Sequence, residues 1–405
     1  MMSKLEKLIQ ELCPDGVEYK KLGEIATILR GGNLQKKDFR TEGVPCIHYG
    51  QIYTRYGLFA DKAFSFISEN CSKKQKMAYT SDIIMAVTSE NIEDVCKCVA
   101  WLGEEAIAVS GHTAIIHHNQ NAKYLVYYFH TKMFVTQKRK LVHGTKVMEV
   151  TPDTLNTVTL PVPPLPVQNE IVRILDNFME LTAELMAELT ARKKQYEYYR
   201  DILLEKYIGA KKVKLSTICA IYDGTHQTPQ YTDDGIPFVS VENIDDLYGT
   251  TKYISKEAYS KFKIKPQIGD VFMTRITAGI IGKCAVVDRN DDLAYYVSLA
   301  LLRPNKAILD SRYLKYYLES GLGKRELHKR ILWNATPTKI NKEDIGKLDI
   351  SIPPLDIQKD LVRILDNFDA LCSNPISALP TEIEARQKQY EYYRDKLLTF
   401  KELNA

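Results

Sequence analysis

Two kinds of hydrophobic pattern alternate along the chain. Short apolar runs opened by a turn-forming residue, at 82–87 and again at 270–274, have the length and composition of β-strands. Tyrosine-rich segments at 124–129 and 313–318 are typical of helices. Over 178–207 the apolar residues recur at helical spacing and form a stripe along about eight turns. The pattern predicts an α+β chain in which two mixed α/β heads are separated by long helices.

Prolines mark the beginning of each helical segment. Residues 163–165 and 353–355 (Pro-Pro-Leu) are expected to form extended hinges, because proline lacks an amide donor and disfavours helix in the residue before it. We expect a short helix after each hinge and then a long helix, which in the first segment would extend ~45 Å. In the second segment Pro375 and Pro380 interrupt the pattern. Its long helix is therefore expected to begin at Thr381, the N-cap of a Thr-x-x-Glu capping box.

The apolar stripes of the two long helices need a surface to cover them. The favoured arrangement is an antiparallel coiled coil, which would make the spacer a ruler for the separation of the heads. The alternative is that each helix packs on its own head. The residues predicted at this helix interface, or at a surface for partner subunits, are Leu181, Leu185, Leu189, Tyr196, Tyr199, Leu203, Ile383, Tyr390, Tyr393 and Leu397.

Two stretches of the helical segments occur twice, almost letter for letter. Residues 172–178 (Val-Arg-Ile-Leu-Asp-Asn-Phe) return at 362–368, and residues 194–201 (Lys-Gln-Tyr-Glu-Tyr-Tyr-Arg-Asp) return at 388–395. Runs this long do not recur by chance, so the chain is a tandem duplication with an internal pseudo-twofold repeat. The spacers stayed alike whereas the heads diverged. The predicted boundaries are 1–160 and 211–350 for the heads, and 161–210 and 351–405 for the spacers.

Composition places the chain among soluble globular proteins. Its 405 residues are 45% hydrophobic and 26% charged, which allows two or three domains, and the net charge of +4 is too small to identify a partner. No apolar run approaches the ~20 residues that cross a bilayer, and the first residues lack the apolar core of a secretory signal. The eight cysteines are scattered and are expected to be reduced thiols, which predicts a cytoplasmic location.

Catalytic and metal-binding signatures are missing from the sequence. It has no phosphate loop, no Gly-x-Gly-x-x-Gly dinucleotide loop, no Gly-x-Ser-x-Gly elbow, no His-Glu-x-x-His pair and no Asn-Pro-Pro-aromatic methyltransferase motif. Cys96 and Cys98 lie near three histidines but lack a second spaced ligand pair, so no metal site is predicted. A duplicated chain without a catalytic motif in either half favours binding over catalysis.

Basic runs and polar loops occur at matching places in the two heads. Residues 138–140 (Lys-Arg-Lys) and 328–330 (His-Lys-Arg) are each followed by small polar residues, a composition that suits contact with DNA phosphates. A solvated helix face is the ordinary alternative for one such run, and the recurrence favours DNA. Exposed polar side chains in other loops are candidates for reading base edges. The candidate DNA-contacting residues are Gln51, Tyr53, Arg55, Lys138, Arg139, Lys140, Thr145, Lys146, Thr225, His226, Thr228, Asn243, Arg275, Thr277, Lys329, Arg330, Thr338 and Lys339.

Together these features resemble the specificity subunit of type I restriction–modification systems. The likeness covers essentially the whole chain. It rests on the opening at 12–19 (Leu-Cys-Pro-Asp-Gly-Val-Glu-Tyr), the Pro-Pro-Leu-x-x-Gln boxes at 163–168 and 353–358, the Asp-Gly-Thr-His-x-Thr-Pro loop at 223–229 and the two spacer helices. Residues 181–189 resemble the four-residue Thr-Ala-Glu-Leu repeats found in some spacers.

The resemblance implies a non-catalytic protein that reads a split site in double-stranded DNA, one half in each of two target-recognition domains. The spacers would set the gap and dock two methyltransferase subunits, to which restriction subunits can add. S-adenosylmethionine, ATP and Mg²⁺ would be bound by those partners, and this chain would need no cofactor or metal. The proline-broken second spacer departs from strict equality of the two docking surfaces. Two other interpretations stay open: a restriction–modification enzyme acting alone, and a two-headed scaffold that binds proteins rather than DNA.

Overall fold

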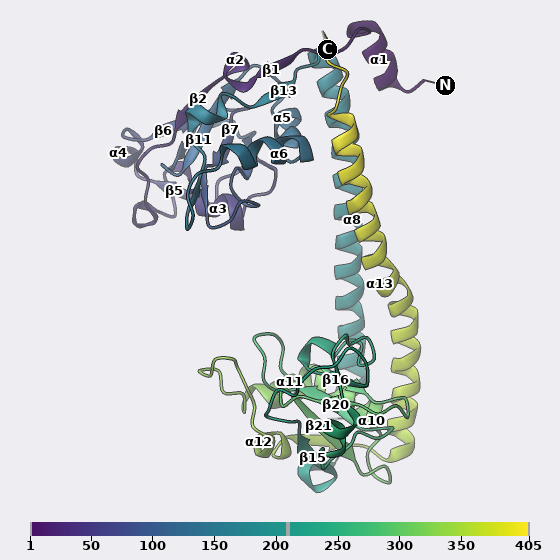
Figure 1. The fold of residues 1–405 in the computed structure, drawn as a ribbon. Helices are drawn as coiled ribbons and strands as arrows, with labels where there is room; N and C mark the ends of the chain where they lie inside the picture. The colour runs from purple at the N-terminus through teal and green to yellow at the C-terminus, as the bar shows by residue number, and fades with distance from the viewer. Residues whose placement is uncertain (1, 208–210, 404–405) are drawn as a thin grey trace. The chain divides into compact units, whose positions relative to one another are not determined.

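The chain forms two compact units, each made of a head and part of both long helices (Figure 1). The computed structural model describes residues 2–207 and 211–403, except for the side chains of 370–379. Unit 1 contains the residues up to 186 together with those from 381 onward, and unit 2 contains residues 187–380. Unit 1 is therefore built from both ends of the chain.

Unit 1 contains two mixed sheets and two short strand pairs. The larger sheet has, in order, β2 (Ala26–Arg30), β11 (Thr113–His118), β7 (Ile83–Ala86), β9 (Cys98–Trp101) and β4 (Phe59–Ala60). The smaller sheet has β5 (Ser65–Ile67), β3 (Val44–Ile47), β10 (Ile107–Val109) and β6 (Lys76–Ala78). The pairs are β1 (Tyr19–Lys21) with β13 (Thr159–Pro161), and β8 (Thr88–Ser89) with β12 (Met148–Glu149).

Strand β7 shows why a strand of this head appears in the sequence as a continuous apolar run. Its side chains alternate between two cores: Ile83 and Met85 belong to one cluster, and Ile84 and Ala86 belong to another. A strand that is buried on both faces has no polar alternation in its sequence. The helices of unit 1 are α1 (Lys4–Leu12), α2 (Leu22–Ile25), η1 (Lys36–Asp38, a 3₁₀ turn), α3 (Tyr49–Thr54), α4 (Glu69–Ser72), α5 (Ala122–Tyr128), α6 (Lys132–Leu141) and α7 (Pro152–Leu155).

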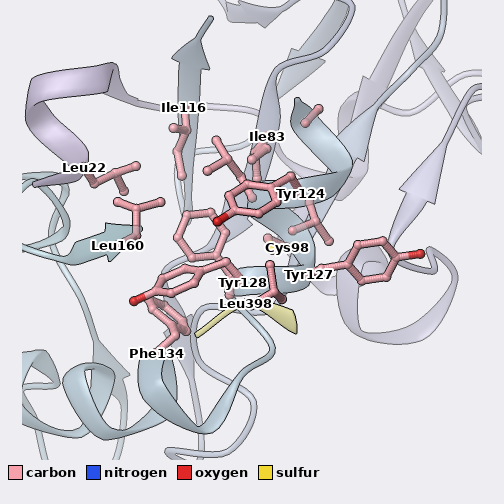
Figure 2. Packing of buried hydrophobic residues seen from close by; sticks show 14 of the residues in the cluster. Leu22, Ile83, Cys98, Ile116, Tyr124, Tyr127, Tyr128, Phe134, Leu160 and Leu398 are labelled. Carbon is pink, nitrogen blue, oxygen red and sulfur yellow. The ribbon is translucent and has the colours of Figure 1, made fainter. Parts of the chain in front are cut away.

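The main core of unit 1 lies between the larger sheet and helices α5 and α6. Figure 2 shows Tyr124, Tyr127 and Tyr128 of α5 and Phe134 of α6 among aliphatic residues of the strands, with Leu398 from the far end of the chain beside them. The buried hydroxyl groups donate to main-chain carbonyls: Tyr124 to Pro161 (2.9 Å) and Tyr128 to Thr159 (2.6 Å). The tyrosine-rich segment at 124–129 thus lies in a helix, as predicted, and its hydroxyls join this helix to β13.

Unit 2 repeats this architecture with fewer strands. Its larger sheet has, in order, β15 (Cys219–Asp223), β21 (Leu299–Pro304), β18 (Val271–Thr274) and β19 (Cys284–Val286). Its smaller sheet has β17 (Tyr253–Ile254), β16 (Ile236–Val239) and β20 (Ala294–Tyr295), and β14 (Lys211–Lys214) pairs with β22 (Asp349–Ile352). The helices are η2 (Leu215–Thr217), η3 (Val241–Asn243), α9 (Lys256–Ser260), α10 (Ser311–Glu319), α11 (Gly321–His328) and α12 (Lys342–Gly346). The predicted duplication and the α+β class are confirmed.

Two long helices, α8 (Leu165–Glu205) and α13 (Leu355–Leu397), each continue from one unit into the other. The expectation of a short helix followed by a separate long one is wrong, because each helix is continuous from the leucine of its Pro-Pro-Leu hinge. The expected start at Thr381 is also wrong, because α13 continues through Pro375 and Pro380. A proline inside a helix removes one hydrogen bond and causes a local clash. Both flanks of α13 pack into a core, through Leu361 and Leu365 in unit 2 and Tyr390 in unit 1, and this packing outweighs that cost.

The apolar residues of the long helices are covered in both of the predicted ways: some pack on the other helix, and others pack on a head. In unit 1, Phe178 of α8 stacks on Tyr393 of α13, with ring centroids 5.5 Å apart, so the helices do pack on each other. In unit 2, Tyr199 stacks in the same way on Phe368. The first turns of each helix pack instead on the head that precedes it, as Leu175 of α8 and Leu365 of α13 show. Of the predicted interface residues, Tyr390 is buried, Leu185, Leu189, Tyr196, Leu203, Ile383, Tyr393 and Leu397 are partly buried, and Leu181 and Tyr199 are exposed.

The Pro-Pro-Leu-x-x-Gln boxes fasten each helix to its head. Gln168 and Gln358 are fully buried. The amide nitrogen of Gln168 donates to Pro163 O (2.8 Å) and its oxygen accepts from the Asn121 amide (3.0 Å) at the N-cap of α5. Gln358 does the same, with Pro353 O (2.9 Å) and the Asp310 amide (2.9 Å) at the N-cap of α10. The repeated glutamine therefore satisfies buried main-chain groups where head and spacer join.

Candidate nucleic-acid interface

A basic hollow in unit 2 gathers the polar loop that follows β15. The Thr225 amide donates to Tyr295 O (3.1 Å), and the Val297 amide donates to Thr225 O (2.9 Å), so the loop is held against the end of β20. A cavity of ≈ 580 Å³ is lined by this loop, including the predicted residues Thr225 and Thr228. His226, also predicted, is exposed in the same loop.

Three lysines line the same cavity, and sequence reasoning missed all of them. They are Lys261, Lys263 and Lys342; the first two are exposed. The carboxylate on this wall, Asp223, is paired with an arginine, so the cavity has an excess of positive charge. Lysines beside exposed amide and hydroxyl groups suit contact with phosphates and base edges. A signal was present at 261–265, where lysines alternate with apolar residues and would lie on one side of an extended segment.

Arg275 and Thr277 follow β18 and have structural roles. Arg275 is only 6% exposed, and its guanidinium pairs with the Asp223 carboxylate. Burial lowers the pKa of Arg275. Arg275, predicted as a candidate base contact, is therefore not exposed, and its buried pair with Asp223 links the ends of β15 and β18. The Thr277 amide donates to Thr338 O (3.0 Å), so the structure brings together two of the predicted loops. Thr338 and Lys339 are partly buried there.

A second hollow lies in unit 1, between α3 and the segment after β8. This cavity of ≈ 850 Å³ is lined by the predicted Gln51, Tyr53 and Arg55 and by Lys36, Ser89 and Asn91. Arg55 is exposed, with its guanidinium carbon 5.9 Å from the centroid of the Phe64 ring. The Tyr53 hydroxyl donates to Thr88 O (2.8 Å), which joins α3 to β8. The wall also contains Glu90 and Asp94, so this hollow is more evenly charged than that of unit 2.

Gln51 and Asn243, predicted as base contacts at matching places, both cap helical turns. The Gln51 side chain is 8% exposed; its oxygen accepts from the His48 amide (2.9 Å) and its nitrogen donates to Ser65 Oγ (2.7 Å). Asn243 accepts from the Ser240 amide (3.1 Å) and is partly buried. The expectation that Gln51 is exposed is wrong, since its amide groups already have partners. The two residues do correspond, but as parts of capping boxes.

The basic run at 138–140 divides into a buried and an exposed part. Lys138 is 5% exposed, and its ammonium donates to the main-chain oxygens of Glu93 (3.0 Å) and Val95 (2.9 Å). Burial lowers the pKa of Lys138. Lys138 was predicted to contact phosphates, but its charge faces carbonyl groups inside unit 1. Arg139 and Lys140 are exposed, as are Thr145 and Lys146 in the loop that follows.

The matching run in unit 2 is largely paired with carboxylates. The Arg330 guanidinium donates to Glu326 Oε2 (2.8 Å) and to the Glu326 carbonyl oxygen (2.9 Å). Its side chain is 18% exposed, whereas that of Lys329, which also pairs with Glu326, is 64% exposed. Exposed pairs of this kind contribute little to stability, so Lys329 can exchange its partner for a phosphate more easily than Arg330 can.

Metal-binding and membrane-spanning features are absent from the described residues. Over 2–207 and 211–403 no group of three His, Cys, Asp or Glu side chains could hold a metal ion. Cys96 and Cys98 are buried, and burial raises the pKa of the Cys96 thiol to about 12. No helix in the same residues is long and apolar enough to cross a bilayer.

Comparison with known proteins gives consistent matches over both halves. The family model described as type I restriction modification DNA specificity domain matches residues 14–192 and 208–385. A putative type I restriction enzyme specificity subunit of Haemophilus influenzae is 28% identical, over 98% of each chain. The EcoR124I/EcoR124II specificity subunit of Escherichia coli is 34% identical over 58% of this chain and 60% of that protein. A solved structure from work on assembly and conformational transition of the type I R-M system covers 96% of this chain and 98% of its own, with a TM-score of 0.62 and 20% identity, which is a likeness of fold.

Proposed function

Because the chain belongs to the type I restriction modification DNA specificity family, we propose that it reads a bipartite site in duplex DNA, one half with each head. The proposal rests on a contrast between the parts that the two units share, their sheets and head-to-helix junctions, and the loops, in which they differ. The two units share strand order and the same fastening of head to helix, whereas their loop-lined hollows differ in side chains and charge. Two different hollows on one repeated frame suit two different half-sites.

In unit 2 the hollow beside β15 would hold one half-site. Lys261 and Lys263 would contact phosphates, because their ammonium groups are exposed at its rim. Thr225 and Thr228 line the hollow, and His226 is exposed next to them, so these three side chains are the candidates for base contact. Arg275 would act indirectly, by holding Asp223 and so the start of the loop.

In unit 1 the corresponding reader would be the surface around α3 and the loop after α6. Arg55 is the strongest candidate for a base contact, since a guanidinium can bond to guanine through two donors and this one is exposed. Arg139, Lys140, Thr145 and Lys146 are exposed and would contact the phosphates. We place the two recognition domains at 1–160 and 211–350, with 161–210 and 351–405 as the spacers.

The chain is a specificity subunit, and in this family catalysis lies in partner subunits. We infer that the helices dock two methyltransferase subunits, and that restriction subunits add to this core. Exposed apolar side chains on the helices favour such docking: Leu181, Met186, Tyr198, Ile202 and Tyr392 are 46–63% exposed. S-adenosylmethionine, ATP and Mg²⁺ would be bound by those partners, and the complex would act on DNA in the cytoplasm.

Mapping of methylated adenines in the host genome, with and without this gene, tests the proposal. Loss of methylation at one split motif is expected, and the motif gives both half-sites and the gap. The separate variants Arg55→Ala and Thr228→Ala should then each relax one half-site and leave the other unchanged. If the gene makes no difference to methylation although the partner subunits are present, the DNA-reading function is refuted. Salt-independent or absent binding to duplex DNA would favour the scaffold alternative instead.

A further inference from the structure

The outer edge of β19 in unit 2 is uncovered, whereas the matching edge in unit 1 is covered. In unit 1, β4 pairs in parallel with β9, and the Ala100 amide donates to Leu58 O (3.0 Å). In unit 2 the sheet ends at β19, and no strand among residues 211–403 pairs with its outer side. Val286 pairs with Val271 of β18 as Ala100 pairs with Ile83 of β7, so Val286 is the counterpart of Ala100.

The main-chain groups of Val286 point away from the sheet. The Val287 amide donates to Asp270 O (2.8 Å), and the Thr274 amide donates to Lys283 O (2.9 Å), so residues 283 and 287 face β18. Alternate residues of an antiparallel strand face opposite edges, and residues 284 and 286 therefore face outward. The outward amide of Cys284 donates to Glu319 Oε1 (2.9 Å). The outward groups of Val286 are those that an added strand would bond.

Empty space follows this edge. One cavity of ≈ 830 Å³ is lined by Val286 and Asp288 on the strand side and by Arg312, Lys315 and Tyr316 on the opposite side. A second cavity of ≈ 460 Å³ shares Val286, Asp288 and Lys315 with the first and continues toward Cys284. Together they extend along the strand, which is the shape that an extended segment requires.

The wall opposite the strand has the same construction in both units. In unit 1 the Tyr127 hydroxyl donates to Asp176 (2.6 Å), and Lys123 pairs with the other carboxylate oxygen (2.6 Å). In unit 2, Tyr316 and Arg312 make the same two contacts with Asp366, each at 2.7 Å.

In unit 1 this wall binds an aromatic ring. The ring of Phe59 in β4 lies edge-to-face against Tyr127, with centroids 5.4 Å apart, and the Lys123 ammonium lies 4.8 Å from the Phe59 centroid. A cation over one face and a tyrosine at the edge make a favourable site for phenylalanine. The guanidinium of Arg312 provides the same cation in unit 2, and it is more than half exposed.

In unit 2 the segment that corresponds to β4 does not lie beside β19. A Tyr-Gly pair occurs at 56–57 and again at 248–249; Leu-Phe-Ala follows the first, and Thr-Thr-Lys follows the second. The Thr250 hydroxyl donates to Phe238 O (2.9 Å), and the Phe238 amide donates to Lys252 O (2.8 Å). The polar substitution thus directs this segment to β16, and the edge of β19 stays open.

We propose that the outer edge of β19 is a docking site for an extended segment of a partner protein. The segment would add a parallel strand that bonds the main chain of Val286 and would place a phenylalanine-type side chain against Arg312 and Tyr316. The occupant is identified by what covers the matching edge in unit 1, a Leu-Phe-Ala strand. This inference concerns protein docking and does not depend on the reading of DNA by either head.

The test uses a fluorescent peptide with the sequence of residues 56–62 (Tyr-Gly-Leu-Phe-Ala-Asp-Lys) and the full-length chain. Fluorescence anisotropy should show saturable binding, with a Kd on the order of 100 μM. Val286→Pro removes the outward amide and replaces the partly buried valine side chain, at an edge position where proline is tolerated. It should raise the Kd at least tenfold and leave DNA binding unchanged. A peptide that carries Phe59→Ser should bind at least tenfold more weakly to the unchanged chain.

Three outcomes would overturn the proposal. They are the absence of binding at millimolar peptide, equal affinity of the parent and serine peptides, and equal affinity of the Val286→Pro variant in circular-dichroism-verified folded form. Sedimentation of the chain alone tests whether the edge is occupied instead by a second copy of this chain. A concentration-dependent dimer that Val286→Pro abolishes would assign the edge to a second copy of this chain and refute the partner segment.

Discussion

The basic run on α6 should separate into a residue that stabilises unit 1 and residues that bind DNA. Lys138→Met removes the ammonium that donates to the main-chain oxygens of Glu93 and Val95 but keeps the length of the side chain. The double substitution Arg139→Ala and Lys140→Ala removes two exposed charges from the same helix. The two variants therefore test the structural and the electrostatic part of one short run independently.

The expected magnitudes follow from burial. A hydrogen bond to a charged group contributes about 1.5–3 kcal/mol, and part of the gain from the two bonds of Lys138 is offset by the cost of burying its charge. Lys138→Met should therefore lower the free energy of unfolding of unit 1 by about 2 kcal/mol. Loss of two exposed charges should change stability by no more than about 0.5 kcal/mol. It should instead flatten the plot of log K against log salt by up to about 1.8, since each phosphate contact contributes about 0.9.

Urea unfolding and duplex binding at several salt concentrations measure the two effects. The exchange of Arg139 for lysine and Lys140 for arginine is the matched control, because it keeps both charges and should keep the salt slope. The reasoning is refuted if Lys138→Met flattens the slope while unfolding is unchanged, because Lys138 would then reach the DNA. An unchanged slope in the double alanine variant would leave the exposed pair as a solvated helix face.

Three further outcomes are expected. The Arg173 hydrogen bond and Lys4 lower the pKa of Glu170 to about 2, so ionised Glu170 stabilises the protein above its ordinary pKa and this stabilisation is lost as the pH falls toward 2. Glu170→Gln should remove about 1–2 kcal/mol of the acid-dependent change in the free energy of unfolding, and equal pH profiles of variant and parent would contradict this role. Gln358→Ala removes a buried amide that satisfies three main-chain groups and should cost about 2–4 kcal/mol in urea unfolding of unit 2, whereas a loss below 1 kcal/mol would show that the box is dispensable. Insertion of Ala-Glu-Leu-Thr after Leu189 lengthens a helix by ~6 Å and, at ~3.4 Å per base pair, should widen the gap in the methylated motif by one or two base pairs; a change in the half-sites would refute the ruler.

The architecture was predictable because it depends on features that repeat. Short apolar runs, helical patterns, the Pro-Pro-Leu hinges and the copied segments each occur twice, so each half supports the assignment of the other. The helix boundaries were less predictable. Pro375 and Pro380 are local breakers, and local chemistry carries no information on the distant packing of Leu365 and Tyr390 that keeps α13 continuous.

The candidate site was less predictable, because composition does not reveal which polar side chains the fold already uses. Gln51 and Asn243 lie three residues after a residue whose amide they cap, and a capping box at the start of a short turn gives little sequence signal. The burial of Lys138 did have a signal. It lies four residues after Phe134, so the two share a helix face, and Phe134 is buried. Helical phase would have separated Lys138 from Arg139 and Lys140.

The heads diverged while the spacer helices stayed almost unchanged, and the contacts that join each head to its helix explain why. Each spacer glutamine accepts from a main-chain amide of its head, and Asp176 and Asp366 each bond one tyrosine and one cation. These contacts constrain very few head side chains, so the loops around each hollow can change without loss of the junction. Within each unit one ring of the Phe–Tyr stack comes from each copy of the repeat. Both copies must therefore keep both rings, and the frame stays alike while the two reading surfaces are free to differ.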